Sequence, residues 1–317
     1  MNRSPRLAGG HLAALFTGLC AVALTAGAAA PKLEVALTFD DLPRNGGIAP
    51  GAKESDFARD TVRVLKKHRI PPSYGFINAN KLERNPDGAR ALQIWIESGN
   101  PLANHTYSHL DITTNSVEDF QKEILRNEPA LELLTPGDKD WRWFRYPYLH
   151  EGDTLEKRRA VRAFLASSGY RIAQTTIDWE DYLWNGAHAR CVAKNDTQAI
   201  EWLRSSYLAE AERWMRVQRD LSRQVWGRDI KHVALLHLGS FSSHILPDLF
   251  KLLEREGYRI VTLEEAHSDP IYASDPDVAA PRGGTLTELM MQSKGISWPP
   301  GFGDMDKPRE KLRSICN

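Results

Sequence analysis

The chain has 317 residues, and its 41 lysine and arginine residues balance its 41 aspartate and glutamate residues, so the formal net charge is zero. This balance argues against a nucleic-acid-binding protein, because such proteins present a basic face. The hydrophobic content of 42% is normal for a globular protein that buries a full core.

The first thirty residues have the pattern of a secretory signal peptide. Two arginines precede an apolar run at residues 12–24, and the small residues 26–28 (AGA) fit a cleavage site. The run is too short and wrongly flanked for a transmembrane helix, so we expect cleavage after residue 28 and no remaining membrane span. An uncleaved anchor and a lipoprotein attached through Cys20 are the alternatives. We therefore expect a secreted or periplasmic protein.

Export bears on the cysteines, because Cys191 and Cys316 remain after the predicted cleavage. Two cysteines in an oxidising compartment can pair, which would tie the C-terminal region to the body of the protein. The sequence gives no geometry, so a disulfide and two free thiols both remain open.

Strand-like and helix-like segments alternate along the mature chain. Apolar runs between turn residues predict strands at residues 32–39, 73–79, 100–105, 141–146, 170–177, 231–238 and 258–263. Helical spacing and capping residues predict helices at residues 55–68, 87–98, 116–134, 154–168, 196–225 and 245–256. This alternation predicts parallel βαβ units, and the length suits an α/β barrel in a single catalytic domain. Residues 268–317, rich in Gly, Pro and Asp, are expected to form a partly irregular C-terminal extension.

Two short patterns together predict a metal site. Asp40 and Asp41 (TFDD) follow the first predicted strand, at the face of a barrel where chemistry takes place. His105 and His109 (HTYSH) are four residues apart, which on a helical turn puts both imidazoles on one face. Consecutive strand-end residues point in opposite directions, so one aspartate can ligate the metal while the other takes a proton from water. An Asp-Asp turn and a chance histidine pair are the plain alternatives, and the coincidence of both patterns disfavours them.

A proton donor is expected at His237, which ends an apolar strand (LLHLG). Such a histidine can be an ordinary core residue, but a strand end in a barrel faces the catalytic mouth. The segment IDWEDY offers Asp178 and Asp181 to keep the histidine charged. Arg145 (FRYPY) can hold the basic aspartate, or make an ordinary surface ion pair.

The segments TFDD, HTYSH, RYPY, DWEDY and LLH resemble, in order and spacing, the five motifs of the polysaccharide deacetylases, the NodB-homology or carbohydrate esterase family 4 group. The resemblance spans residues 33 to about 263. It implies a distorted (β/α) barrel of the NodB-homology type, at residues 29–267, and a divalent metal, usually Zn²⁺.

The resemblance also implies roles for individual residues. The general base would be Asp40, tethered by Arg145, and the general acid would be His237, held by Asp181 or, as second choice, Asp178. The metal ligands would be Asp41, His105 and His109. The backbone N–H of Tyr148 would stabilise the oxyanion, and Leu235 would face the acetyl methyl group. Trp179 is expected to stack on a sugar ring, although it and Trp141, Trp143 and Trp184 also suit the barrel core.

The expected function is removal of acetyl groups from N-acetylated amino-sugar polymers or oligomers, such as chitin or peptidoglycan. An O-acetyl esterase acting on acetylated xylan would use the same residues and remains open. An inactive carbohydrate-binding protein would be expected to lack one of them. A closed structural zinc site would need a fourth protein ligand, and the sequence offers three clear ones.

Overall fold

The structure is a computed structural model that describes residues 33–138, 140–299 and 306–317. The predicted signal peptide lies outside these residues. Lys32–Asn317 form one compact unit. None of the helices in the described ranges is both long and apolar enough to cross a membrane.

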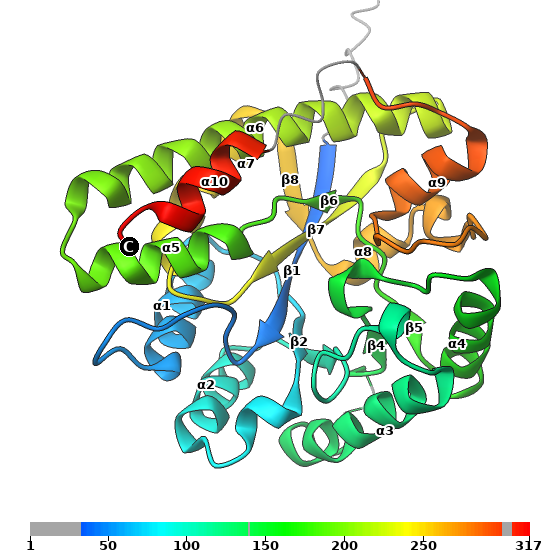
Figure 1. The fold of residues 1–317 in the computed structure, drawn as a ribbon, viewed down its shortest axis with the longest axis horizontal. Coiled ribbons are helices and arrows are strands. Elements are labelled where there is room, and N and C mark those ends of the chain that lie inside the picture. The colour runs from blue at the N-terminus through cyan, green and yellow to red at the C-terminus, as the bar shows by residue number, and fades with distance from the viewer. Residues whose placement is uncertain (1–32, 139, 300–305) are drawn as a thin grey trace, which may run out of the picture. The chain divides into compact units, whose positions relative to one another are not determined.

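One curled sheet of parallel strands organises this unit (Figure 1). In the described ranges its order is β5-β4-β3-β2-β1-β7-β6, with β8 paired to β1. The strands are β1 (Leu33–Leu42), β2 (Gly75–Ile77), β3 (Leu102–Asn104), β4 (Trp143–Phe144), β5 (Arg171–Ile172), β6 (Ile177–Asp178), β7 (Lys231–His237) and β8 (Tyr258–Val261). A curled sheet of parallel strands joined through helices is the predicted distorted (β/α) barrel, which is therefore confirmed.

Helices surround the sheet, as Figure 1 shows for α1 to α4 and α6 to α8. The α-helices are α1 (Glu54–Lys67), α2 (Pro86–Glu97), α3 (Val117–Leu134), α4 (Leu155–Ser167), α5 (Tyr182–Ala193), α6 (Thr197–Trp226), α7 (Ser242–Arg255), α8 (Leu263–His267), α9 (Leu286–Lys294) and α10 (Asp306–Ser314). Short 3₁₀ turns are η1 (Ala79–Leu82), η2 (Ile112–Thr114), η3 (Pro147–Leu149) and η4 (Pro270–Ala273).

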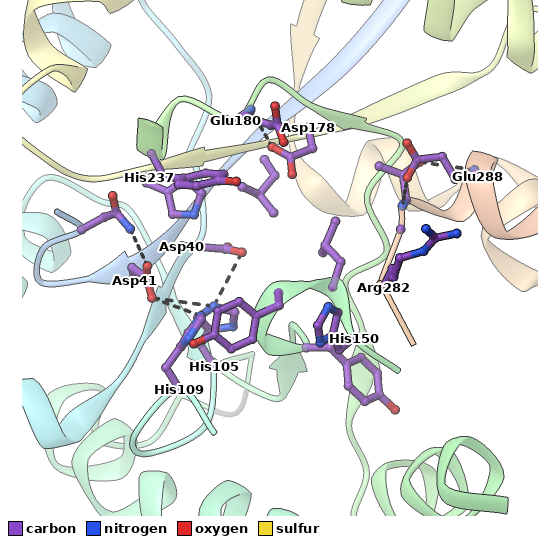
Figure 2. Close-up of a pocket in the computed structure, with 18 of the residues that line it drawn as sticks. Asp40, Asp41, His105, His109, His150, Asp178, Glu180, His237, Arg282 and Glu288 are labelled. Atoms are coloured by element: carbon purple, nitrogen blue, oxygen red, sulfur yellow. Dashed lines mark hydrogen bonds and ion pairs between the residues drawn. The ribbon is translucent and has the colours of Figure 1, made fainter. Parts of the chain in front are cut away.

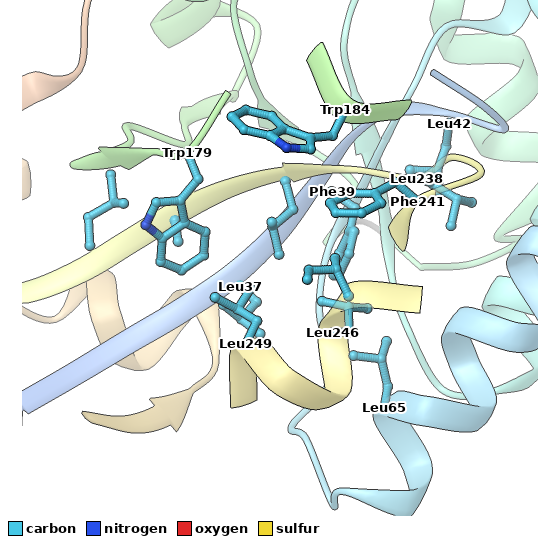
Figure 3. Packing of buried hydrophobic residues seen from close by; sticks show 14 of the residues in the cluster. Leu37, Phe39, Leu42, Leu65, Trp179, Trp184, Leu238, Phe241, Leu246 and Leu249 are labelled. Atoms are coloured by element: carbon cyan, nitrogen blue, oxygen red, sulfur yellow. The ribbon is translucent and has the colours of Figure 1, made fainter. Parts of the chain in front are cut away.

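The central strand β1 is buried on both faces, so its period of two decides what each side chain meets. Leu37 and Phe39 join the core between sheet and helices (Figure 3). Phe39 packs edge-on against Trp95, with ring centroids 5.2 Å apart. Ala36 lies in the second cluster, inside the curl of the sheet. Asp40 continues this inner face, which places it inside the barrel at the carboxyl end of the strand.

Most predicted elements are present, with three differences. The strand predicted at residues 170–177 is two short strands, β5 and β6. The helix α5 was not predicted, because it is buried on several sides and shows no single apolar stripe. The C-terminal extension contains the helices α9 and α10, which pack on the barrel next to α6 and α5 (Figure 1).

Cys191 and Cys316 form a disulfide with their Cα atoms 5.1 Å apart. The bridge ties the residues after α10 to α5, and Arg190 Nη2 donates to the carbonyl of Leu312 at 2.6 Å beside it. Of the two states that the sequence left open, the structure has the paired one.

Candidate active site

The strand register brings the proposed base and acid together. In the parallel pairing of β1 with β7, Asp40 lies opposite His237. Residues paired in this way share one face of the sheet, so both side chains enter the mouth of the barrel. Figure 2 shows the two side chains next to each other in the cavity.

Asp40 is almost fully buried and is held from behind by a buried guanidinium. Arg145 Nη1 lies 3.3 Å from both carboxylate oxygens of Asp40. Arg145 is itself fixed, because its Nε donates to the carbonyl of Ala173 and its Nη2 donates to Thr38 Oγ1. Burial raises the pKa of Asp40, and the Arg145 charge offsets only part of this effect. The result is a carboxylate with raised basicity and a fixed orientation.

Asp41 has the opposite electrostatic environment. Its backbone adopts a left-handed conformation (φ 67°), which turns its side chain away from that of Asp40. Asn45 Nδ2 donates to Asp41 Oδ2 at 2.7 Å, and Lys81 Nζ donates to Oδ1 at 3.2 Å and to the Asp41 carbonyl at 3.0 Å. Burial alone would raise the pKa of Asp41, but the charge of Lys81 and the neighbouring histidines lowers it far below its usual range. Asp41 is therefore a permanently ionised, oriented oxygen donor.

His105 and His109 lie on a loop after β3, so the expected helical turn between them is wrong. Left-handed conformations at Thr106 (φ 63°) and His109 (φ 61°) bend the chain instead, and the ring centroids are 4.8 Å apart. His105 Nδ1 lies 2.8 Å from the carbonyl of Arg145, so it carries the proton and leaves Nε2 as a free lone pair.

These two histidines and Asp41 fit a divalent cation. One donor atom from each residue lies within 4.8 Å of the others, with His109 Nε2 3.5 Å from Asp41 Oδ1. Burial lowers the pKa of His105 and of His109 to about 3, so both imidazoles are neutral at pH 7. Neutral imidazoles and an ionised carboxylate are the donor set that zinc prefers.

His237 is charged and held by one carboxylate. Its Nδ1 lies 2.7 Å from Asp181 Oδ1, and its backbone N–H donates to Asp181 Oδ2 at 2.8 Å. Burial would lower the pKa of His237, but the Asp181 charge and hydrogen bond, with Asp41 and Asp40, raise it to about 9. Asp178, the second choice for this partner, instead accepts a hydrogen bond from the Glu180 N–H.

A cavity of about 520 Å³ opens onto these groups (Figure 2). Among the predicted site residues, those that line it are Asp40, Asp41, His105, His109, Tyr148, Leu235 and His237. Arg145 and Asp181 lie behind the lining and act through Asp40 and His237. Asp178 also lines it, and burial raises its pKa to about 6.

The prediction that Trp179 contacts the substrate is wrong. Trp179 is 1% exposed and packs in the hydrophobic core with Leu37 and Leu249, as Figure 3 shows. Its strand-end neighbours Asp178 and Glu180 face the cavity, and the alternation along the chain turns the indole away from it. The cavity is bordered instead by Tyr182 and by Trp214 of α6.

Several lining residues could not be found from motifs. Trp214 and Gln218 come from α6, while Arg282, Thr285 and Glu288 come from the C-terminal extension. Lys81 and Asn45 hold Asp41 but lie in ordinary polar segments of the sequence. The one feature of the sequence that could have pointed to such lining residues was the unusual length of the helix before β7.

Comparison with known proteins finds sequence similarity over roughly the first half of the chain. A family model described as polysaccharide deacetylase matches residues 27–173. A peptidoglycan-N-acetylglucosamine deacetylase of Bacillus cereus is 26% identical over 164 residues, which cover 52% of this chain and 51% of that protein. A chitooligosaccharide deacetylase of Sinorhizobium fredii is 28% identical over 122 residues, covering 38% of this chain and 49% of that protein.

The fold has a match among solved structures. A pseudoenzyme of carbohydrate esterase family 4 from Bacillus anthracis superposes with a TM-score of 0.50 at 17% identity, over 74% of this chain and 65% of that one. The sequence matches described above span about half the length of the curated relatives. His237 and Asp181 lie beyond the matched residues 27–173, so their placement rests on the structure of this chain.

Proposed function

We propose that this chain, whose residues 27–173 match a family model described as polysaccharide deacetylase, is a metal-dependent hydrolase that removes acetyl groups from N-acetylated amino-sugar polymers or oligomers. The proposal rests on one observation: three groups of side chains lie at the same cavity. These groups are the possible metal ligands Asp41, His105 and His109, the Asp40–Arg145 pair and the His237–Asp181 pair.

The proposed metal is zinc, held by Asp41, His105 and His109. When bound, it supplies Lewis acidity that lowers the pKa of water and polarises a carbonyl group. Three protein donors leave a coordination position open, which favours a catalytic over a structural site. Lys81 and Asn45 orient Asp41, and the Arg145 carbonyl orients His105, so the donors are fixed before a cation binds.

Asp40 is the proposed general base. Its raised pKa supports proton uptake from the attacking water, and Arg145 keeps the carboxylate in place while it gains the proton. His237 is the proposed general acid, because its pKa of about 9 keeps it protonated at neutral pH and ready to protonate the leaving amine. The backbone N–H of Tyr148 is the proposed donor to the oxyanion, whose stabilisation is commonly the largest catalytic effect.

Leu235 is the proposed wall for the acetyl methyl group, since it is an apolar residue of the cavity two positions before His237. The substrates named for the relatives support an amino-sugar chain: peptidoglycan N-acetylglucosamine, chitin and chitooligosaccharides. The predicted signal sequence and the disulfide support a secreted or periplasmic site of action.

Acetate release by the mature protein tests the proposal. The protein would be assayed zinc-loaded and after chelation, on chitin oligomers, peptidoglycan and acetylated xylan. We expect zinc-dependent release from an N-acetylated substrate. Release from xylan alone would make the protein an O-acetyl esterase, and no release from any substrate would contradict the proposal.

Asp40→Asn removes the base while keeping the size of the side chain. We expect kcat to fall by about 10²- to 10⁴-fold, because general base catalysis contributes that much. Zinc affinity, measured by titration with a competing chelator, should stay close to that of the wild type, because Asp40 is not among the three donors. Asp60→Asn is the matched control, because Asp60 lies half exposed on α1, outside the cavity lining, and pairs with Arg63. Unchanged kcat in Asp40→Asn would contradict the assigned base.

A further inference from the structure

The C-terminal extension reaches the loop that carries Tyr148. We propose that Gly283 is a positioning residue of the catalytic site, because it holds the Tyr148 loop (residues 146–150) in the conformation that presents the Tyr148 N–H to the cavity. The inference rests on the proposed function, in which that N–H stabilises the oxyanion.

The Tyr148 loop has an unusual backbone. Tyr148 (φ 60°, ψ 9°) and Leu149 (φ 56°) both adopt left-handed conformations, although neither is glycine. Such conformations cost on the order of 1–3 kcal/mol each and persist only where surrounding structure enforces them. Something outside the loop must therefore hold it.

One side of the loop is held by the neighbouring histidine loop. His150 Nδ1 lies 2.9 Å from Asp111 Oδ1, and the Tyr148 ring packs edge-on against the His109 ring with centroids 4.3 Å apart. Leu149 N–H and His150 N–H donate back to the carbonyls of Tyr146 and Pro147. In the described ranges the Tyr148 N–H donates to no acceptor, so it is available to a substrate.

The other side of the loop is held by Gly283, which approaches it more closely than any side chain could. A Cβ atom at Gly283 (φ +68°) would lie 2.6 Å from the Tyr148 carbonyl oxygen, 2.7 Å from His150 Cδ2 and 3.2 Å from the Leu149 carbonyl carbon. Real Cβ atoms are essentially never found closer than 3.0 Å to such atoms, so only glycine fits here.

The turn that carries Gly283 is anchored at both ends and cannot easily retreat. Before it, Ala280 N–H donates to the Gly152 carbonyl at 2.9 Å. After it, Leu286 N–H donates to the Thr175 carbonyl at 2.7 Å, and Leu286 is fully buried. A larger residue at position 283 would therefore displace the Tyr148 loop rather than its own turn.

The test compares two glycines with the same backbone conformation. Gly283→Ala introduces the clash with Tyr148, whereas Gly295→Ala adds the same atom at φ +65° with nothing within 4 Å. Both variants should lose similar stability, since alanine is strained at positive φ. Only Gly283→Ala should lose kcat, by about 10- to 100-fold, because a misplaced oxyanion donor acts on the transition state. KM and zinc affinity should change less than about threefold, since neither depends on that donor.

Crystal structures of the two variants give a readout that does not depend on activity. We expect the Tyr148 backbone to move in Gly283→Ala and to stay in place in Gly295→Ala. Equal kcat in the two variants, or an unmoved Tyr148, would overturn the inference. If the wild type releases no acetate from any substrate, the proposed function fails, and the structures alone then decide whether Gly283 holds the loop.

If Gly283→Ala does not fold, the variant Pro281→Gly provides a second test of the same proposal. It adds no atoms near Tyr148 but loosens the turn before Gly283, because proline restricts the chain. We expect faster amide hydrogen exchange at Tyr148 and a several-fold lower kcat. Unchanged exchange at this amide would contradict the proposal.

Discussion

Asp40 and Asp41 are adjacent in the chain but differ in the sign of their pKa shifts. Burial raises the pKa of Asp40, while Lys81 and the histidines lower that of Asp41. The left-handed turn at Asp41 makes this difference possible, because it sends the two side chains to different partners. One dipeptide thereby supplies both a proton acceptor and an anionic metal donor.

The His237–Asp181 pair predicts the alkaline limb of the pH profile. With a pKa of about 9, His237 stays protonated until the pH approaches that value, so kcat/KM should fall above about pH 9. Asp181→Asn removes the charge that raises this pKa, and the alkaline limb should move to a lower pH. An unmoved limb in Asp181→Asn would show that His237 is not the acid.

The same pair makes a linked prediction for stability. The pKa of His237 is about 9 in the folded protein and about 6.5 in the unfolded chain. The resulting stabilisation is therefore complete below about pH 6.5 and disappears as the pH rises through about 9. A shift of this size corresponds to about 3 kcal/mol. Urea unfolding should therefore separate wild type from Asp181→Asn more at pH 6 than at pH 9.5.

Most residues of the site could be predicted because strand ends are visible in the sequence. Asp40, Asp41 and His237 follow apolar runs, and such positions meet at one face of a parallel barrel. Lys81 and Gly283 could not be predicted, because their roles depend on contacts across 40 and 135 positions of the chain with no local pattern to mark them. Trp179 was misplaced because an aromatic residue beside a motif suits both core and cavity.

At the scale of elements, the bounds of the amphipathic helix α6 were predicted to within one residue, whereas the buried helix α5 was not predicted at all. The helix α6 was expected at residues 196–225 and is found at Thr197–Trp226, with a capping Asp196 and a terminal Gly227. The helix α5 was missed because its buried positions include Trp184, Asn185 and His188, a mixture without a single apolar face.

The disulfide between α5 and the residues after α10 gives a prediction at this scale. Its ends are 125 residues apart, and closing such a loop is expected to stabilise the protein by about 5 kcal/mol. Urea unfolding with and without dithiothreitol measures the difference. The double variant Cys191→Ser, Cys316→Ser is the control, since dithiothreitol should have no effect on it. An equal midpoint for reduced and oxidised wild type would contradict a paired state in solution.

Reduction of the disulfide should also affect a residue that lines the cavity. Arg309 of α10 pairs with Glu180, which lines the cavity. Release of α10 would remove this cation from Glu180, whose pKa burial already raises to about 7. The disulfide therefore stabilises the wall as well as the fold.

At the scale of the whole molecule, buried histidines predict sensitivity of the metal-free protein to acid. Burial lowers the pKa to about 3 for His105, His109 and His267, and to about 4 for His188 and His232. The unfolded chain binds protons at these residues below about pH 6.5, while the folded protein does not. Stability should therefore fall as the pH drops from 6.5 toward 4, by up to about 1.4 kcal/mol per pH unit for each histidine.

Four carboxyls in the described ranges oppose this trend, and two of them, Asp40 and Glu288, have pKa values that burial raises. Asp178 and Glu180 have raised pKa values of about 6 and 7, so the folded protein takes up their protons first and gains stability as the pH falls. Because the five histidines outnumber these four carboxyls, we expect a net loss of stability. Urea unfolding at pH 7 and pH 5 measures it, and His232→Gln should reduce the slope. Equal stability at both values would contradict the prediction.

The sheet has two free ends in the described ranges, β5 and β6, and the C-terminal extension forms hydrogen bonds with Thr175, which lies between these strands in the chain, and with Gly152. Asp40, Asp41 and His237 lie on the paired strands β1 and β7, whereas Arg282 and Glu288 line the cavity from the C-terminal extension. We therefore expect substitutions at Arg282 and Glu288 to change which substrates the cavity accepts while the proton and metal donors stay in place.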